Sequence, residues 1–236
     1  MRAEVRHQLK HDKFAEATAE TVSWAVEHRK TLITAGVVGG VIVAVVLGGF
    51  YYLQTRDEAA SLAMAQAFRS YDAPIVAPGT PAEPGVTTFS SMQDRAKAAQ
   101  AQFRSIAAKY PHTRSGEIAH YFAALADEDL GNTAAAEKEL KDLASGHNQD
   151  LAPLAKFALA NLYRTSGRDK QAIELYKQLI DHPSRSVSKA EAQLELAATY
   201  AGKEPAEARK LYEQIRKDNP TSAAAEIASN RLSALK

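Results

Sequence analysis

The chain has 236 residues, of which 45% are hydrophobic and 24% charged, and its formal net charge at pH 7 is +1. These are ordinary proportions for a folded protein, and the balance of acids and bases gives the chain no electrostatic footprint for nucleic acid. Because there is no cysteine, a disulfide framework, a cysteine-based zinc site and a catalytic thiol are excluded.

Residues 1–30 form a charged arm ahead of a long apolar segment. The apolar positions in this arm follow helical spacing approximately, with charges between them: Val5, Leu9, Phe14, Ala17, Thr21 and Trp24. The pattern favours a solvated helical extension of the apolar segment. The alternative is a helix that lies on a membrane surface or docks a cytoplasmic partner.

Residues 31–55 carry no charge and predict a transmembrane helix. Its apolar core, Thr31–Leu53, would make about 35 Å of helix, enough to cross a hydrocarbon layer of about 30 Å. A soluble helix of this length would need a polar face, and this one has none. The charged region before it and the apolar run are both longer than in a cleaved signal peptide. We therefore expect the helix to stay in the membrane.

The distribution of basic residues predicts the orientation. Arg29 and Lys30 adjoin the first end of the segment, and most of the basic residues near the membrane precede it, whereas Arg56 and Arg69 follow. By the positive-inside rule, the N-terminus should be cytoplasmic. The chain is thus predicted to be a single-pass protein of the inner (plasma) membrane, with its C-terminal domain on the extracytoplasmic, or periplasmic, side.

Small residues recur every fourth position of the predicted span: Gly36, Gly40, Ala44 and Gly48. Such a stripe lets another helix approach closely and would support a homo-oligomer. Small residues are also simply common in membrane helices, so the alternative is that the stripe contacts nothing.

Residues 56–91 predict a first helix and a proline-rich insertion. Met64, Phe68 and Tyr71 fall on one face of a helix over 57–71. Four prolines then follow within residues 72–91, which disfavours both helix and strand.

Residues 92–236 predict a stack of helical hairpins with a capping helix at Ala223–Leu235. A small residue is followed by large apolar residues at +4 and +7, and this triplet recurs about every 36 residues. The four copies are Ala99, Phe103 and Ile106; Ala136, Leu140 and Leu143; Ala172, Tyr176 and Leu179; and Ala208, Tyr212 and Ile215. Three preceding helices should end near glycines: Gly131, Gly167 and Gly202. The predicted fold class is all-α, one transmembrane helix followed by a helical-hairpin solenoid.

Several of these residues resemble the tetratricopeptide consensus. The segments that match its second helix are Ala99, Phe103, Ile106 and Pro111, and Ala208, Tyr212, Ile215 and Pro220; Ala160-Asn161-Leu162-Tyr163 with Gly167 is similar to its first helix and turn. The early tryptophan of the consensus is absent, and the second repeat lacks the final proline. The whole layout resembles the YfgM-type ancillary subunit of the bacterial SecYEG translocon. That resemblance implies a periplasmic domain that meets the translocon and periplasmic chaperones.

The sequence contains no catalytic, metal-binding or cofactor-binding motif. His7 and His11 could share a helical face, but two histidines without a third ligand make a poor metal site. Binding of protein is therefore expected on the concave side of the stack, where the repeat register places Tyr121, Phe157, Asn161 and Arg164. The alternative is that the two aromatic residues only pack between repeats.

These observations predict a non-catalytic, membrane-anchored scaffold for protein–protein interaction. The expected partners are translocon subunits, periplasmic chaperones or nascent secreted proteins, and the expected role is assistance to secretion or envelope protein folding. The alternative is a self-associating structural protein of cell division or envelope assembly.

Overall fold

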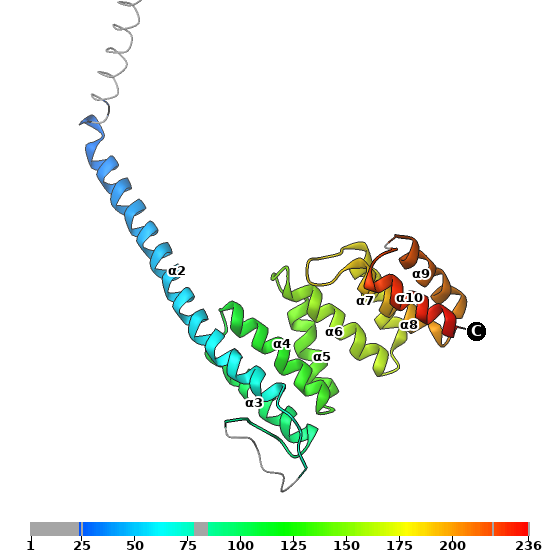
Figure 1. Ribbon diagram of the computed structural model, residues 1–236. Coiled ribbons are helices and arrows are strands. Elements are labelled where there is room, and N and C mark those ends of the chain that lie inside the picture. The colour runs from blue at the N-terminus through cyan, green and yellow to red at the C-terminus, as the bar shows by residue number, and fades with distance from the viewer. Residues whose placement is uncertain (1–23, 25, 78–84, 219, 236) are drawn as a thin grey trace, which may run out of the picture. The chain divides into compact units, whose positions relative to one another are not determined.

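The computed structural model describes residues 24, 26–77, 85–218 and 220–235. Within these residues the regular secondary structure is helical apart from one isolated parallel bridge between Ile75 and Phe89, which confirms the predicted fold class. The helices are α2 (Arg29–Tyr71), α3 (Met92–Lys109), α4 (Arg114–Asp129), α5 (Thr133–Ala144), α6 (Leu151–Thr165), α7 (Asp169–Asp181), α8 (Lys189–Ala201), α9 (Pro205–Asp218) and α10 (Ala223–Ala234). Figure 1 shows α3 to α10 following one another as packed pairs. The charged arm lies almost wholly outside the described residues.

The chain divides into two compact units, residues 1–55 and 56–236. In the described part of the first unit, α2 exposes apolar side chains all round; Val45 and Phe50, for example, are 68% and 67% exposed. Among the described residues α2 is the one helix long and apolar enough to cross a membrane, and none of its most apolar 18-residue window is buried. A core helix of a soluble protein would bury this surface.

The predicted span and the predicted first helix are one continuous helix. α2 runs without a break from Arg29 to Tyr71, so the expected boundary near residue 55 is not a helix end. The reason is local, because no proline or glycine separates Tyr51 from Tyr71. In the second unit, Ala60, Met64 and Ala67 of α2 are buried in a cluster with residues of α3 and α4.

The repeated triplets form the core, as the spacing predicts. The small residue that opens each triplet is fully buried, and the large residue at +4 is at most 2% exposed: Phe103, Leu140, Tyr176 and Tyr212. Small side chains at the first position let the paired helices approach, and the large ones fill the space between them. Leu143 differs from its counterparts and is only half-buried, because α5 ends one residue later.

Polar side chains and glycines set the helix ends. Ser188 and Glu191 form a capping box at the start of α8, and Ser91 and Thr113 accept hydrogen bonds from backbone amides at the starts of α3 and α4. Gly131 and Gly167 follow α4 and α6 with φ of 79° and 73°, a conformation that favours glycine. Gly202 caps α8 as predicted, but with a right-handed φ of −82°.

The two ends of the insertion are tied to the repeats and to each other. Val76 N–H donates to Phe89 O (2.9 Å), and Phe89 N–H donates to Pro74 O (3.1 Å). Ala73 is buried, and its carbonyl accepts a bond from Arg95 of α3 (3.3 Å). The bridge is a departure from the expectation that the prolines would exclude pairing. It forms because Val76 and Phe89 retain the N–H groups that proline lacks.

Candidate protein-binding face

The first helices of the pairs lie closer together than the second helices. α4 contacts α6, α6 contacts α8, and α8 contacts α10, whereas α3, α5, α7 and α9 make no comparable contacts with one another among the described residues. A stack in which one row of helices is drawn together curves toward that row. We call the surface formed by α4, α6 and α8 the inner face.

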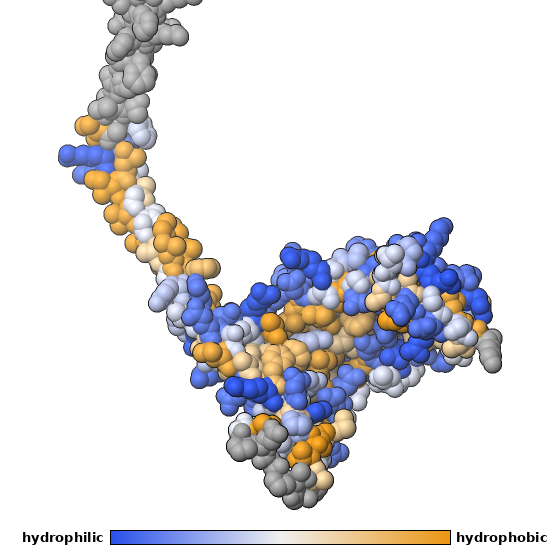
Figure 2. All heavy atoms as spheres, in the orientation of Figure 1, coloured by the Kyte–Doolittle hydropathy of each residue, from blue (hydrophilic) through white to orange (hydrophobic). Residues whose placement is uncertain are grey.

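The register of the helices brings a band of half-buried apolar side chains to the inner face. Seven residues make nearly two helical turns, so Ile118, Tyr121 and Leu125 of α4 share one side, and Leu154 and Phe157 occupy the same register on α6. Figure 2 shows hydrophobic surface gathered over α4 and α6, with hydrophilic surface around it. A concave apolar band with a polar rim is typical of a protein-binding surface.

The two predicted aromatic residues have different surroundings. Tyr121 lies beside Phe122, with ring centroids 5.4 Å apart. Burial raises its pKa, and Glu128 and Tyr71 add to the rise. Phe157 packs edge-on against Tyr176 of α7 at 6.0 Å and also contacts the cluster formed by Leu179, Val187 and Ala192. Both rings therefore pack within the stack while keeping part of their surface at the inner face.

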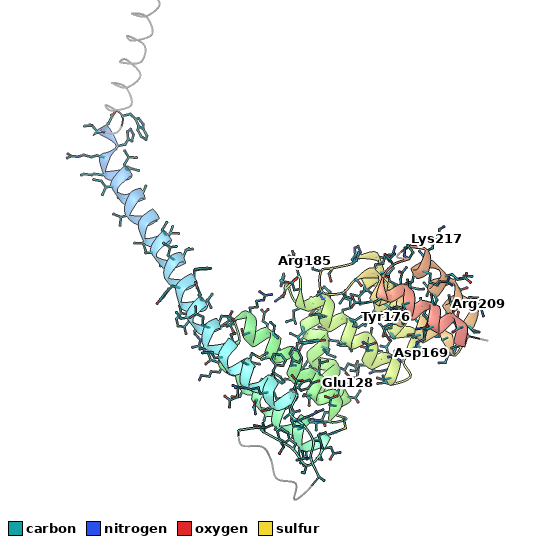
Figure 3. The ribbon with its side chains drawn as sticks, in the orientation of Figure 1. Glu128, Asp169, Tyr176, Arg185, Arg209 and Lys217 are labelled. Atoms are coloured by element: carbon teal, nitrogen blue, oxygen red, sulfur yellow. The ribbon has the colours of Figure 1, made fainter. Side chains whose placement is uncertain are left out.

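The predicted polar residues contact neighbouring helices: Asn161 within its own helix pair and Arg164 in the next one. The Tyr176 hydroxyl donates to Asn161 Oδ1 at 2.6 Å, and Arg164 forms an ion pair with Glu195 of α8 at 3.4 Å. Burial raises the pKa of Tyr176 to about 12, against the lowering effect of Arg164. Figure 3 labels Tyr176 on α7. The structure thus brings Phe157, Asn161 and Arg164 together around Tyr176. Tyr121 lies on α4 and packs against the same hydrophobic cluster as Phe157.

Sequence reasoning missed two acids at the end of α4. Glu128 lies seven residues after Tyr121, in the register of Arg164 one repeat later, and Asp129 follows it. Burial raises the pKa of Glu128, and the charge of Asp129 raises it further. The +7 spacing from Tyr121 is the signal that could have identified Glu128. That neither carboxylate forms an ion pair among the described residues could not have been read from the sequence.

A family model described as a tetratricopeptide repeat-like domain matches residues 22–236. The chain belongs to the tetratricopeptide repeat-like domain family. The match includes the apolar part of α2 as well as all the helix pairs. No protein in the curated set matches the chain.

Two solved structures share the tetratricopeptide-like fold. They are crystal structures of a candidate kinesin light chain from Podosopora anserina with nearly identical TPR-like repeats, and of a single-substitution variant of it. Each is 18% identical to this chain over 60% of its length, with TM-scores of 0.51 and 0.50 and coverage of 78% and 77% of the matched chains. At this identity the likeness shows the fold alone.

Membership of the tetratricopeptide repeat-like family gives the chain the character of a protein–protein interaction scaffold. Within the part of the chain that the structure describes, no group of three or more His, Cys, Asp or Glu side chains could hold a metal ion. The histidine pair His7 and His11 lies outside that part.

The small residues of the predicted stripe are exposed on α2. A methyl group added at Gly36, Gly40 or Gly48 would meet no atom within 4 Å, and Ala44 is exposed as well. The stripe is open to a neighbouring helix, and its role stays a prediction.

Proposed function

We propose that the chain is a single-pass membrane protein that binds other proteins through its inner face on the extracytoplasmic side, in protein secretion or envelope protein folding near the translocon. The observation that carries the proposal is the pairing of two features in one chain. α2 exposes a long apolar surface that water would disfavour, and a tetratricopeptide-like stack follows it. The tether confines the binding domain to the membrane, where it raises the effective concentration of the inner face around membrane-bound partners.

The orientation rests on the basic residues that precede α2's apolar segment. A reporter that is active only outside the cytoplasm, fused after residue 236, is expected to be active. Activity of a cytoplasm-specific reporter at the same position would refute the orientation and the role in secretion.

Photo-crosslinking in intact cells tests the partner class. A photoreactive amino acid at Phe157, which is half-buried at the inner face, is expected to capture translocon or periplasmic chaperone subunits. The matched control places the same amino acid at Glu174, which is exposed on α7. Equal capture from both positions, or no heterologous capture from Phe157, would contradict the proposal.

The alternative is self-association through the small-residue stripe, because small side chains at every fourth position let another helix approach closely. Under this alternative the crosslinked product is a second copy of the chain, and Gly40→Ile abolishes it. Self-crosslinking that survives Gly40→Ile would refute the stripe as the contact.

A further inference from the structure

The inner face ends at two adjacent acids, the half-buried Glu128 and the exposed Asp129. Glu128 and Asp129 form no ion pair among the described residues; Arg95 of α3 attracts Asp129 only at longer range and donates instead to Ala73 O at 3.3 Å. Burial and the charge of its neighbour both raise the pKa of Glu128. Partial desolvation of an uncompensated carboxylate costs free energy, and a cation brought against it would recover that cost.

Two acids of the second helices have partners of their own. Glu137 of α5 accepts bonds from Lys141 and Arg168, both at 2.7 Å, and Glu207 of α9 accepts a bond from Lys210 at 2.6 Å. These acids have internal partners. Glu174 and Asp181 of α7 form no ion pair among the described residues either, but both are exposed, whereas Glu128 is half-buried. Partial burial without an ion pair is what distinguishes Glu128 from these acids.

Aromatic and apolar surface adjoins the acids. Tyr121 lies two helical turns before Glu128 on α4, and the charge of Glu128 raises its pKa; the charge of Asp129 raises the pKa of Tyr71 of α2. The two rings and the two carboxylates therefore share one region. Tyr71 also packs against Phe122, with ring centroids 6.2 Å apart. Aromatic rings and carboxylates both attract a cation, and the rings also accept the hydrocarbon stem that carries it.

We propose that the inner face binds a basic amphipathic segment of a partner protein, with an apolar side chain seated on Tyr121 and Phe157 and a Lys or Arg side chain placed against Glu128 and Asp129. The positions of Tyr121 and Glu128 on α4 set the spacing. Seven residues of helix separate them by about 10 Å, which corresponds to seven residues of a helical partner or three of an extended one. This inference rests on the proposed function and names its partner chemistry.

The test uses the full chain in nanodiscs of zwitterionic lipid and two fluorescent 15-residue peptides. In the first peptide, each Leu has Lys three and seven residues further on; in the second, Gln replaces every Lys. The first should bind about 10-fold more tightly by fluorescence anisotropy, the factor that corresponds to about 1.4 kcal/mol. Equal binding of the two peptides would overturn the proposal, and empty nanodiscs give the signal from lipid alone.

Matched charge variants locate the preference. Glu128→Gln with Asp129→Asn should remove the preference for the Lys peptide and leave binding of the Gln peptide unchanged. Glu174→Gln with Asp181→Asn removes the same charge from exposed positions of α7 and should leave the preference intact. Equal loss from both double variants would mean that net charge alone attracts the peptide, and would overturn the assignment.

A third variant separates this inference from the proposed function. Leu125→Gln places a polar group in the apolar band while both acids remain, and it should weaken binding of both peptides. Unweakened binding of both would count against the inner face as the binding surface, whereas loss of the Lys preference alone concerns only the acids. The helical circular dichroism and unfolding midpoint of each variant confirm that the repeats are folded.

Discussion

Replacing Tyr176 by Phe removes one hydroxyl from the contact between α6 and α7, the two helices of the third pair. That hydroxyl donates to Asn161 Oδ1 at 2.6 Å, and the ring beneath it is fully buried. Phenylalanine keeps the ring and its packing against Phe157, so the substitution tests the hydrogen bond with little change in volume.

The lost bond should lower the free energy of unfolding by about 1–2 kcal/mol. A buried hydrogen bond contributes about 1 kcal/mol, and the larger figure applies when the acceptor, here Asn161, is left unpaired. For a folded unit of about 180 residues, this corresponds to a fall of about 2–8 °C in the unfolding midpoint.

The stability lost in Tyr176→Phe should become smaller as the pH rises above 10. Tyr176 has its pKa raised from 10.0 to about 12 in the folded chain. Because the folded state favours the neutral hydroxyl, its stabilisation is fully present below pH 10 and is lost as pH rises from 10 through 12. Phenylalanine does not titrate, so the difference in unfolding free energy between the wild type and Tyr176→Phe should narrow between pH 10 and pH 12.

The assay is thermal unfolding followed by circular dichroism at 222 nm, with the full chain in a detergent whose charge does not change over the pH range used. Asn161→Ala and the double variant complete a double-mutant cycle, and we expect a coupling of about 1 kcal/mol. Additivity within about 0.3 kcal/mol, or a difference that does not change between pH 9 and pH 12, would refute the hydrogen bond as the source of stability.

Three further predictions concern the hydrogen bonds of Glu137, the tight packing of Gly116 against Tyr110, and the membrane segment. Glu137→Gln should lower the free energy of unfolding by about 1 kcal/mol. Hydrogen bonds from Lys141 and Arg168 lower the pKa of Glu137 to about 2. In acid unfolding, the stability of the wild type should therefore fall more steeply between pH 4.5 and 2 than that of the variant. Gly116→Ala should lower the free energy of unfolding by about 2 kcal/mol or more, because the added carbon would lie 1.8 Å from Tyr110 O. The control is Gly202→Ala, whose added carbon meets open space and which should be neutral or slightly stabilising in the same thermal unfolding experiment. Val41→Arg should release much of the chain from membranes on alkaline extraction, because an arginine at the centre of a span costs about 3 kcal/mol, and full retention would argue against insertion.

The helix pairs were predictable because their signals are local and periodic. The triplet that begins at Ala136 recurs at Ala172 and Ala208, and this spacing places the residue at +4 in the core regardless of what surrounds the pair. The glycines after α4 and α6 were predictable for the same reason, since a left-handed residue ends a helix. The length of α2 was not, because the sequence contains no stop signal between the apolar segment and residue 71, and the change from apolar to amphipathic composition does not end a helix.

Helix register predicted where the candidate residues lie but not what they contact, and their binding role stays a prediction. Register placed Tyr121 and Phe157 on the first helices of their pairs, and both keep a half-exposed surface there. Asn161 and Arg164 were expected to be available to a ligand, but their side chains contact Tyr176 and Glu195 instead. Those contacts join residues on different helices, and helix register alone does not fix such distances.

The sequence by itself determined the all-helical class, the period of the repeats and the presence of a membrane-length apolar helix, because each depends on the order of residue types along the chain. Only the tertiary structure decided which polar groups satisfy one another and which do not. Asp127 and Glu128 are neighbours on α4, yet Asp127 is buried against Arg104 and Gln100 of α3, whereas Glu128 has no such partner in the part of the chain that the structure describes. A hydrogen bond or ion pair requires a partner within about 3–4 Å, and for these side chains the partner comes from another helix, whose position is set by the packing of the whole stack.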